Sequence, residues 1–297
     1  MLRQFKFLFI SFRPKQWIKN LFIFAALIFS ANLLNLSLFL NVLKTFFLFC
    51  ALSSSIYLIN DLFDLKQDKI HPEKRKRPLA SGKLKPTLAL ATAIFLALFS
   101  ISTSFWISLE LGLLFITYFL LFVLYSFILK RLAILDIFII AVGFVLRVMV
   151  GALAISVSLS HWIIICTFFL ALFLGFAKRR HELIVLGDNH SSHRTSLSDY
   201  SLHFIDQMIS VTTASVVISY ALYTVSPETI EHFGTDKMFY TIPFVLYGIF
   251  RYLYLVYKRK EGGSPTEALL TDKALAADVF LWVLAVLVIL YFIPLSN

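Results

Sequence analysis

The sequence predicts an all-α membrane protein whose chain crosses the bilayer about nine times. Hydrophobic residues make up 59% of the 297 residues and charged residues only 15%, whereas soluble domains contain about 25% charged residues. The apolar residues gather in nine stretches of about the length that a helix needs to cross a bilayer. Because only helices or closed barrels satisfy backbone polar groups in lipid, these stretches indicate a polytopic helical bundle without strands.

The predicted spans follow one another without a long polar stretch between them. In chain order they are 17–34, 38–59, 87–106, 110–129, 133–155, 161–177, 205–224, 238–257 and 275–293, each to within about 2–4 residues. The basic segment before the first span has no small-residue cleavage site, so we interpret it as an interfacial amphipathic segment and not as a removed signal peptide. We therefore expect one membrane-embedded domain over residues 1–297, with loops on one side at about 60–86, 130–132, 178–204 and 258–274.

The basic residues justify the number and order of these spans. Of the 27 Lys and Arg residues, five precede residue 21 and eight lie in the loop after the second span. Two, four and four lie in the next alternate loops, whereas the loops on the other side contain only Lys237. One missed or extra helix would scramble this alternation. The positive-inside rule then places the N-terminus and the basic loops in the cytoplasm.

The composition also excludes several classes of function. The net charge of +10 is explained at least in part by topology and by contact with anionic lipid. No basic soluble domain is present to hold nucleic acid. Cys50 and Cys166 lie in apolar stretches and lack the spacing of metal ligands, so neither a zinc site nor a disulfide framework is expected. A polyanionic substrate remains the functional interpretation of the basic side.

Regularly spaced acidic residues stand at the inner end of the second span. Asn60, Asp64 and Asp68 recur every four residues, and Asp61 precedes Asp64 by three, so a helix would place them on one broad face. Like charges at this spacing repel unless a divalent cation lies between them. Mg²⁺ prefers one or two carboxylates together with water and substrate phosphate oxygens. The alternative is that the aspartates only neutralise the basic residues that follow.

Several motifs connect the chain with a known family. The stretch "NDLFDLKQD" (60–68) resembles the first Asp-rich motif, NDxxDxxxD, of the UbiA-type intramembrane prenyltransferase superfamily. The stretches "RPKQWIKN" (13–20), "HPEKRKRPLASG" (71–82), "FLGFAKRRHEL" (173–183) and "GGSPTE" (262–267) resemble its decaprenyl-phosphate phosphoribosyltransferase branch. The resemblance covers nearly the whole chain.

The resemblance implies a particular reaction and its participants. The branch transfers 5-phosphoribose from phosphoribosyl diphosphate to polyprenyl phosphate, releases diphosphate, and supplies cell-envelope glycan synthesis. It implies Mg²⁺, with Mn²⁺ as the alternative, and a location in the bacterial inner membrane with the active site on the cytoplasmic side. Membrane lipid is a further expected partner, and a homo-oligomer is left open. Asp61, Asp64 and Asp68 become the candidate catalytic residues, and together with Asn60 the candidate metal ligands.

The cations and polar residues near the cytoplasmic side are candidates for binding the substrates. They are Arg13, Lys15, Lys19, Asn20, Lys74, Arg75, Arg77, Tyr125, Lys130, Arg147, Lys178, Arg179, Arg180 and Asp206. Other interpretations stay open: an interfacial anchor for the first group, helix-end pairing of Lys178 with Glu182, and structural pairing for Arg147 and Arg251. The compact second Asp motif of many superfamily members is absent, since Asp188, Asp199 and Asp206 are spread out, so a second metal site is not supported.

Two other functions compete with this one. An enzyme that transfers an isoprenoid from polyprenyl diphosphate to an aromatic acceptor would share the first Asp motif, but such an acceptor needs far fewer cations. A lipid-phosphate transporter would accommodate the intramembrane residues Arg147 and Arg251. Its polar residues, however, should run through the bilayer, whereas here they cluster at one side.

Overall fold

The computed structural model describes residues 2–186, 197, 199–259 and 265–292, and these form helices and the turns between them, without any strand. The chain divides into two compact units, which are described separately. The first consists of Met1–Ile139 with Leu146–Ser158, and the second of Ile140–Val145 with Leu159–Asn297. The predicted all-α class is confirmed.

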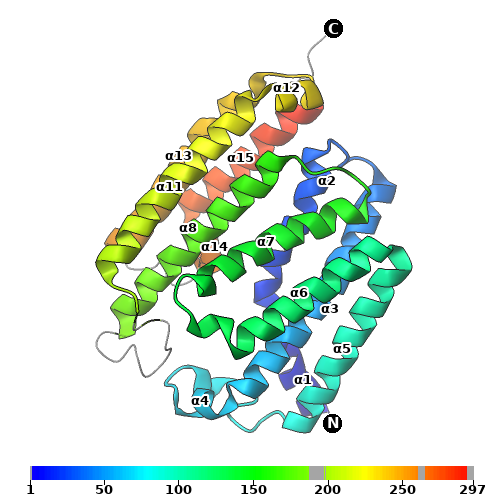
Figure 1. Cartoon of the computed structure of the whole chain (residues 1–297), viewed down its shortest axis with the longest axis vertical. Coiled ribbons are helices and arrows are strands. Elements are labelled where there is room, and N and C mark those ends of the chain that lie inside the picture. Colours follow the sequence, from blue (N-terminus) through cyan, green and yellow to red (C-terminus); the bar gives the residue numbers. More distant parts are fainter. Residues whose placement is uncertain (1, 187–196, 198, 260–264, 293–297) are drawn as a thin grey trace. The chain divides into compact units, whose positions relative to one another are not determined.

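The first unit is built around one long helix. It contains α1 (Leu2–Ser11), the 3-10 helix η1 (Pro14–Phe24), α2 (Ala25–Phe29), α3 (Leu36–Phe63), α4 (Leu65–Ile70), η2 (Lys74–Lys76), α5 (Pro86–Ile107), α6 (Leu109–Phe127), η3 (Leu129–Arg131) and most of α7 (Leu135–Ala154). In Figure 1, α3 lies against both α5 and α6. The oxygen of the Asn35 side chain accepts hydrogen bonds from the first turn of α3, which fixes where that helix begins.

The second unit contains two pairs of long helices. Its elements are α8 (His161–Leu186), α11 (Leu202–Val225), α12 (Pro227–Phe233), η5 (Lys237–Thr241), α13 (Ile242–Tyr254), the π-helical η6 (Leu255–Arg259), α14 (Pro265–Thr271) and α15 (Lys273–Phe292). α11 packs on α8, and α13 packs on α15 (Figure 1). α11 also contacts α13.

Eight helical segments in the described part of the chain are long and apolar enough to cross a membrane. They correspond to the second to ninth predicted spans. The first predicted span differs, because it consists of η1 and α2, which are 11 and 5 residues long. A 3-10 helix rises about 2.0 Å per residue and an α-helix 1.5 Å, so the two together extend about 30 Å, close to the thickness of the hydrocarbon core.

Contacts of the first helix show that η1 and α2 lead away from α1 and that α3 returns. The Gln4 side chain donates to the carbonyl of Lys83 at 3.0 Å and accepts from the amide of Lys85 at 3.3 Å. Arg13 likewise contacts Asp61 near the end of α3. The N-terminal helix therefore lies at the same end of this unit as the loop between α4 and α5.

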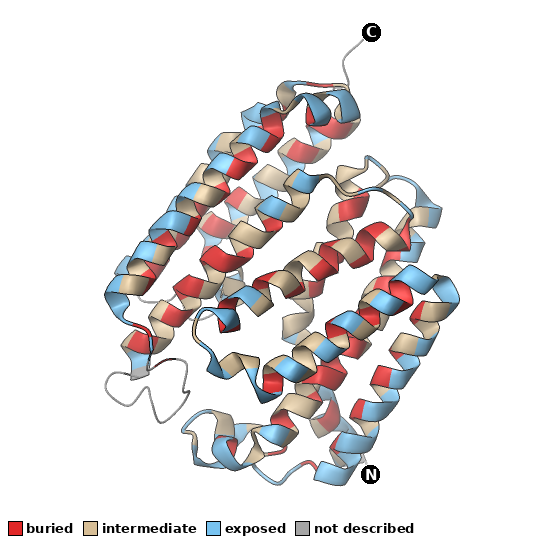
Figure 2. Ribbon diagram, in the orientation of Figure 1, coloured by how far each residue is buried: buried red, intermediate tan, exposed pale blue. Residues whose placement is uncertain are grey.

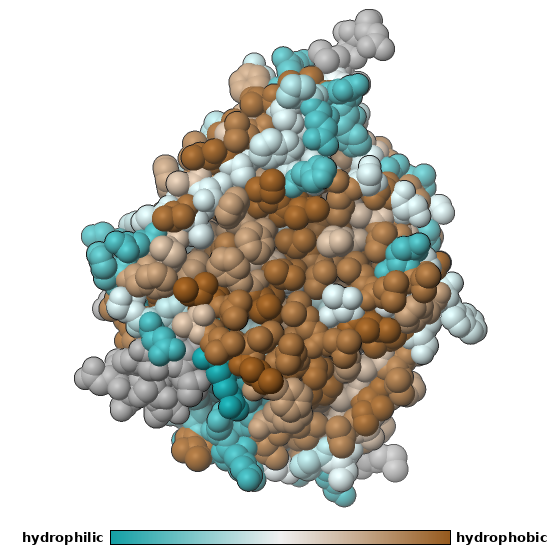
Figure 3. All heavy atoms as spheres, viewed as in Figure 1, coloured by the Kyte–Doolittle hydropathy of each residue, from teal (hydrophilic) through white to brown (hydrophobic). Residues whose placement is uncertain are grey.

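Helix α5 illustrates how this unit distributes small and large side chains. Its small residues face inward and let α3 approach closely, and Figure 2 shows buried segments along α5. They are Ala89, Ala93, Ala97, Ser100 and Ser104. Its large side chains point outward, and Trp106 is 92% exposed. In Figure 3 the surface over α5 and α6 is mostly apolar, as expected of a surface that contacts lipid.

Candidate functional site

The candidate site is formed where α3 ends and α4 begins. Asp61 lies in the last turn of α3, Asp64 stands between the two helices, and Asp68 lies within α4. Asp61 and Asp68 are buried, whereas the side chain of Asp64 is 21% exposed. A helix C-terminus carries partial negative charge, so three carboxylates here require cations nearby. The structure supplies three.

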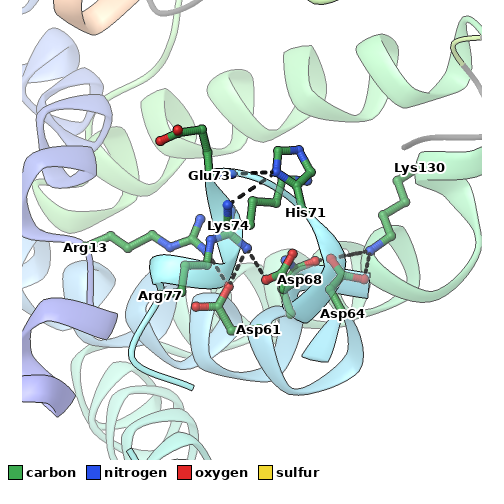
Figure 4. Close-up of polar contacts among 10 residues, drawn as sticks. Arg13, Asp61, Asp64, Asp68, His71, Glu73, Lys74, Arg77 and Lys130 are labelled. Carbon is green, nitrogen blue, oxygen red and sulfur yellow. Dashed lines mark hydrogen bonds and ion pairs between the residues drawn. The ribbon is translucent and has the colours of Figure 1, made fainter. Parts of the chain in front are cut away.

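Two arginines from different segments bind the buried aspartates (Figure 4). Arg13, just before η1, forms an ion pair with Oδ1 of Asp61. Arg77, which follows η2, places Nη1 at 3.1 Å from the same oxygen and at 2.6 Å from Oδ2 of Asp68. One guanidinium nitrogen therefore bridges the two buried carboxylates.

Lys130 from η3 binds the remaining aspartate. Its Nζ lies 2.6 and 2.8 Å from the two carboxylate oxygens of Asp64 and 3.5 Å from Oδ1 of Asn60. The four residues of the Asp motif thus form two pairs, Asp61 with Asp68 and Asn60 with Asp64, and each pair shares one cationic nitrogen. The sequence predicted all of these residues as site residues, and the structure brings them together.

Neighbouring side chains that the motif did not reveal hold these cations in place. Arg13 has a left-handed backbone with φ of 54°, and its guanidinium lies 5.0 Å from the centre of the Tyr57 ring. Nδ1 of His71 accepts from the backbone amides of Glu73 and Lys74 at 3.1 and 3.3 Å, which shapes the turn that leads to Arg77. Tyr57 precedes Asp61 by four residues, so helical spacing was the available signal.

The donor set fits a divalent cation. Among the described residues, no three His, Cys, Asp or Glu side chains converge on one ion position, because the carboxylates bind Arg and Lys instead. Each pair of oxygen-bearing side chains nevertheless already surrounds a single positive atom, and oxygen ligands are those that Mg²⁺ prefers. Asn60, Asp61, Asp64 and Asp68 therefore remain the residues that could hold the ion.

Arg147 lies deeper in the first unit and contacts other polar side chains. It is 4% exposed and donates from Nε to Oδ1 of Asn20 at 3.0 Å and from Nη2 to the hydroxyl of Tyr118 at 2.6 Å. Asn20 in turn donates to Ser53 at 3.1 Å and to Cys50 at 3.2 Å. These contacts give Arg147 and Asn20 an evident role in joining η1, α3, α6 and α7.

The remaining predicted residues of the first unit are either exposed or only partly buried. The side chains of Lys15 and Arg75 are exposed. Lys19, Lys74 and Tyr125 are partly buried and have contacts of their own. The structure therefore leaves the assignment of these five residues to substrate as a prediction.

The predicted residues of the second unit form ion pairs along α8 and α11. Lys178 lies 3.9 Å from Glu182, as the i,i+4 spacing predicted, and Arg179 pairs with the same carboxylate. Nε of Arg180 donates to Oδ1 of Asp206 at 2.7 Å.

The structure also bears on the other polar residues of the second unit that the sequence singled out. Arg251 makes two hydrogen bonds with Asp272, at 3.0 and 2.8 Å, so its structural interpretation is supported. Asp199 is exposed. Asp188 and the first residues of "GGSPTE" lie outside the described residues.

The fold and the site define a polytopic helical membrane protein with an Asp-rich cluster at the end of one span. The chain matches the model of the UbiA prenyltransferase family over residues 20–284. It belongs to this family of membrane transferases. The structure of a UbiA homologue from Archaeoglobus fulgidus bound to GPP and Mg²⁺ has the same fold, with a TM-score of 0.71 at 19% identity, covering 95% of this chain and 99% of that one.

Curated relatives within the family resemble the chain over nearly their full length. The decaprenyl-phosphate phosphoribosyltransferase of Corynebacterium glutamicum is 32% identical over 96% of this chain and 87% of its own. That of Mycolicibacterium smegmatis is 31% identical over 94% of this chain and 91% of its own. The expected resemblance to this branch is confirmed.

Proposed function

We propose that the chain transfers 5-phosphoribose from phosphoribosyl diphosphate to a polyprenyl phosphate and releases diphosphate. The observation that carries this proposal is the convergence of Arg13, Arg77 and Lys130 on the Asp motif at the end of α3. The names of the curated relatives support the choice of donor and acceptor. The product would serve cell-envelope glycan synthesis on the cytoplasmic side of the bacterial inner membrane.

The reaction places specific demands on the site. The bond between C1 of the ribose and the diphosphate oxygen breaks, and its electron pair leaves with diphosphate. An oxygen of the lipid phosphate forms the new bond to C1. Because this phosphate is already an anion, it needs no strong general base. The principal demand is to hold several anionic groups together and to stabilise the charge that develops on the leaving group.

The residues of the site suit these demands. A divalent cation, when bound by the Asp motif, would offset the charge of the diphosphate. Arg13, Arg77 and Lys130 are attached to separate segments and point toward carboxylates of the same Asp motif (Figure 4). An ion or phosphate that took over some of these contacts would release guanidinium and ammonium groups to bind phosphate oxygens. The ribose carbon would pass through an oxocarbenium-like state, as in other glycosyl transfers.

The test uses full-length protein purified in detergent. It is incubated with phosphoribosyl diphosphate labelled in the ribose, decaprenyl phosphate and Mg²⁺, and the lipid is then extracted. We expect label in the organic phase, lost with EDTA and restored by Mg²⁺ or Mn²⁺. If no label is extracted while labelled isoprenoid is transferred from polyprenyl diphosphate to an aromatic acceptor, the proposal is wrong and the competing prenyltransferase function holds.

A further inference from the structure

A groove open to the surface runs along the second unit between α11 and α13. Its inner section is walled by apolar side chains, among them Ile209, Ala214 and Ile218 of α11 and Leu246 and Phe250 of α13. The section has a volume of about 580 Å³, within the range of sites that hold small ligands. Both walls belong to segments long and apolar enough to span a membrane, so this section is accessible to lipid chains.

The groove continues into a mouth at the start of α11 that carries charged and polar side chains. The mouth section is lined by His203, Asp206 and Gln207 together with the apolar Met208 and Val211, and it shares Ser210 and Tyr257 with the inner section. The groove therefore has one charged end and one apolar end. This asymmetry matches an amphiphile whose headgroup lies at the membrane surface and whose chain follows the helices.

The charges at the mouth form one fixed pair of opposite sign. Oδ1 of Asp206 accepts both from Nε of Arg180, at 2.7 Å, and from the hydroxyl of Tyr257, at 2.9 Å. The Arg180 guanidinium stacks 4.0 Å from the centre of the Tyr257 ring. Arg180 binds Asp206 through Nε, so its two terminal nitrogens do not contact that carboxylate, and both bonds to Asp206 end on Oδ1, not on Oδ2. The mouth thus presents an acceptor and a set of donors side by side.

A further polar atom lies in the wall of the inner section. The hydroxyl oxygen of Thr213 is buried and has no hydrogen-bond partner among the described residues, although Thr213 lines the groove. Thr213 follows Asp206 by seven residues, which is about 10 Å along a helix. A buried hydroxyl without a partner costs free energy, so a ligand acceptor at this depth would stabilise it.

We propose that this groove binds a phospholipid with a primary-amine headgroup, of the phosphatidylethanolamine type. The ammonium would donate to Oδ2 of Asp206, and the phosphate would accept from the terminal nitrogens of Arg180. The Thr213 hydroxyl would donate to a glycerol ester carbonyl, and one acyl chain would occupy the apolar section. A polyprenyl phosphate fits less well, because it offers neither an ammonium for Asp206 nor an ester carbonyl for Thr213.

The test measures lipid adducts of full-length, delipidated protein by native mass spectrometry. The probes are dioleoyl phosphatidylethanolamine, phosphatidylcholine and phosphatidylglycerol. Choline cannot donate an N–H hydrogen bond, and phosphatidylglycerol has no ammonium. We expect phosphatidylethanolamine to bind about tenfold more tightly than either, the ratio that one charge-assisted hydrogen bond supplies after partial solvation. Asp206→Asn should reduce this ratio to about one.

Groove-blocking variants locate the binding. Ala214→Trp fills the inner section and should abolish the tight adduct, whereas Ala91→Trp, at an exposed alanine of α5, should retain it. Should Ala214→Trp fail to fold, Thr213→Val is the nearly isosteric second variant, with an expected threefold to tenfold loss. Equal binding of phosphatidylethanolamine and phosphatidylcholine would overturn the proposal. So would an unchanged adduct in the folded blocking variant, or displacement of the lipid by equimolar decaprenyl phosphate.

Discussion

Burial separates the three aspartates of the Asp motif into two kinds. Asp61 and Asp68 are buried and share Arg77, so their charges are tied to the stability of the fold. Asp64 is partly exposed, and within the described part of the chain its ion pair is with Lys130. A change at Asp64 should therefore affect chemistry more than folding.

Replacement of Asp64 by asparagine tests its role in catalysis. Asp64→Asn preserves shape but removes the charge that would hold a metal–diphosphate group, so we expect transfer of labelled phosphoribose to fall about 100-fold or more. The matched control is Glu73→Gln, because Glu73 is exposed in the loop that follows and its ion pair is with the exposed Lys76. Full transfer by folded Asp64→Asn would refute the metal assignment.

Replacement of Arg77 tests whether a cation is needed between Asp61 and Asp68. Arg77→Met leaves two buried carboxylates without their shared partner, and loss of one member of a buried pair costs about 3–5 kcal/mol. Arg13 still binds Asp61 and the side chain of Arg77 is 27% exposed, so we expect a loss of about 2–3 kcal/mol in the free energy of unfolding.

Added Mg²⁺ should then stabilise this variant more than the wild type, because an ion that binds only the folded state raises its stability. Thermal unfolding in detergent, with about 10 mM Mg²⁺ or with EDTA, measures the difference in stabilisation between the variant and the wild type. Lys69→Met, at an exposed position of α4, is the control. Equal Mg²⁺ shifts in wild type and Arg77→Met would contradict a metal position between these carboxylates.

At the scale of elements, η1 is held by close packing against α7 as well as by Arg147. A Cβ atom at Gly151 would lie 1.9 Å from the carbonyl oxygen of Ile23, so only glycine permits this approach. Arg147 stands one helical turn before Gly151 and donates to Asn20, one turn before Ile23. Two contacts one turn apart therefore fix η1, whose N-terminal end carries Arg13.

Substitution of Gly151 should consequently displace η1. We expect Gly151→Ala to destabilise the protein by about 3 kcal/mol and to lower transferase activity through Arg13. Gly112→Ala is the matched control, because its Cβ would meet the Phe105 ring, at 2.4 Å, and the whole Phe105 side chain can turn about χ1 whereas a backbone carbonyl cannot move. Equal losses in detergent-based unfolding of the two variants would contradict this account.

At the scale of the whole molecule, the sequence predicted the fold better than the details of the site. Apolar stretches and charge alternation depend on the bilayer and are local in sequence, so eight spans appear where expected. The pairing of Asp61 with Arg13 and Arg77 depends on a left-handed residue before η1 and on the His71 turn. Neither leaves a periodic signal. The 3-10 conformation of η1 was missed because hydropathy does not distinguish 3-10 from α-helix.

The number of crossings can be decided by labelling from outside the cell. The contact between Gln4 and Lys83 places α1 and the α4–α5 loop at the same end of the first unit, so we expect η1 with α2 to cross the bilayer once before α3 returns. We therefore expect Lys6→Cys and Lys69→Cys, each in a protein whose native cysteines are replaced by alanine, to react with an impermeant maleimide only after permeabilisation. Asp236→Cys lies in a loop that is predicted on the outer side of the membrane, so it should react in intact cells. All three residues are exposed, so reactivity reports the side of the membrane. Labelling of Lys6→Cys but not Lys69→Cys in intact cells would mean that η1 and α2 do not cross, and that the chain spans the bilayer eight times.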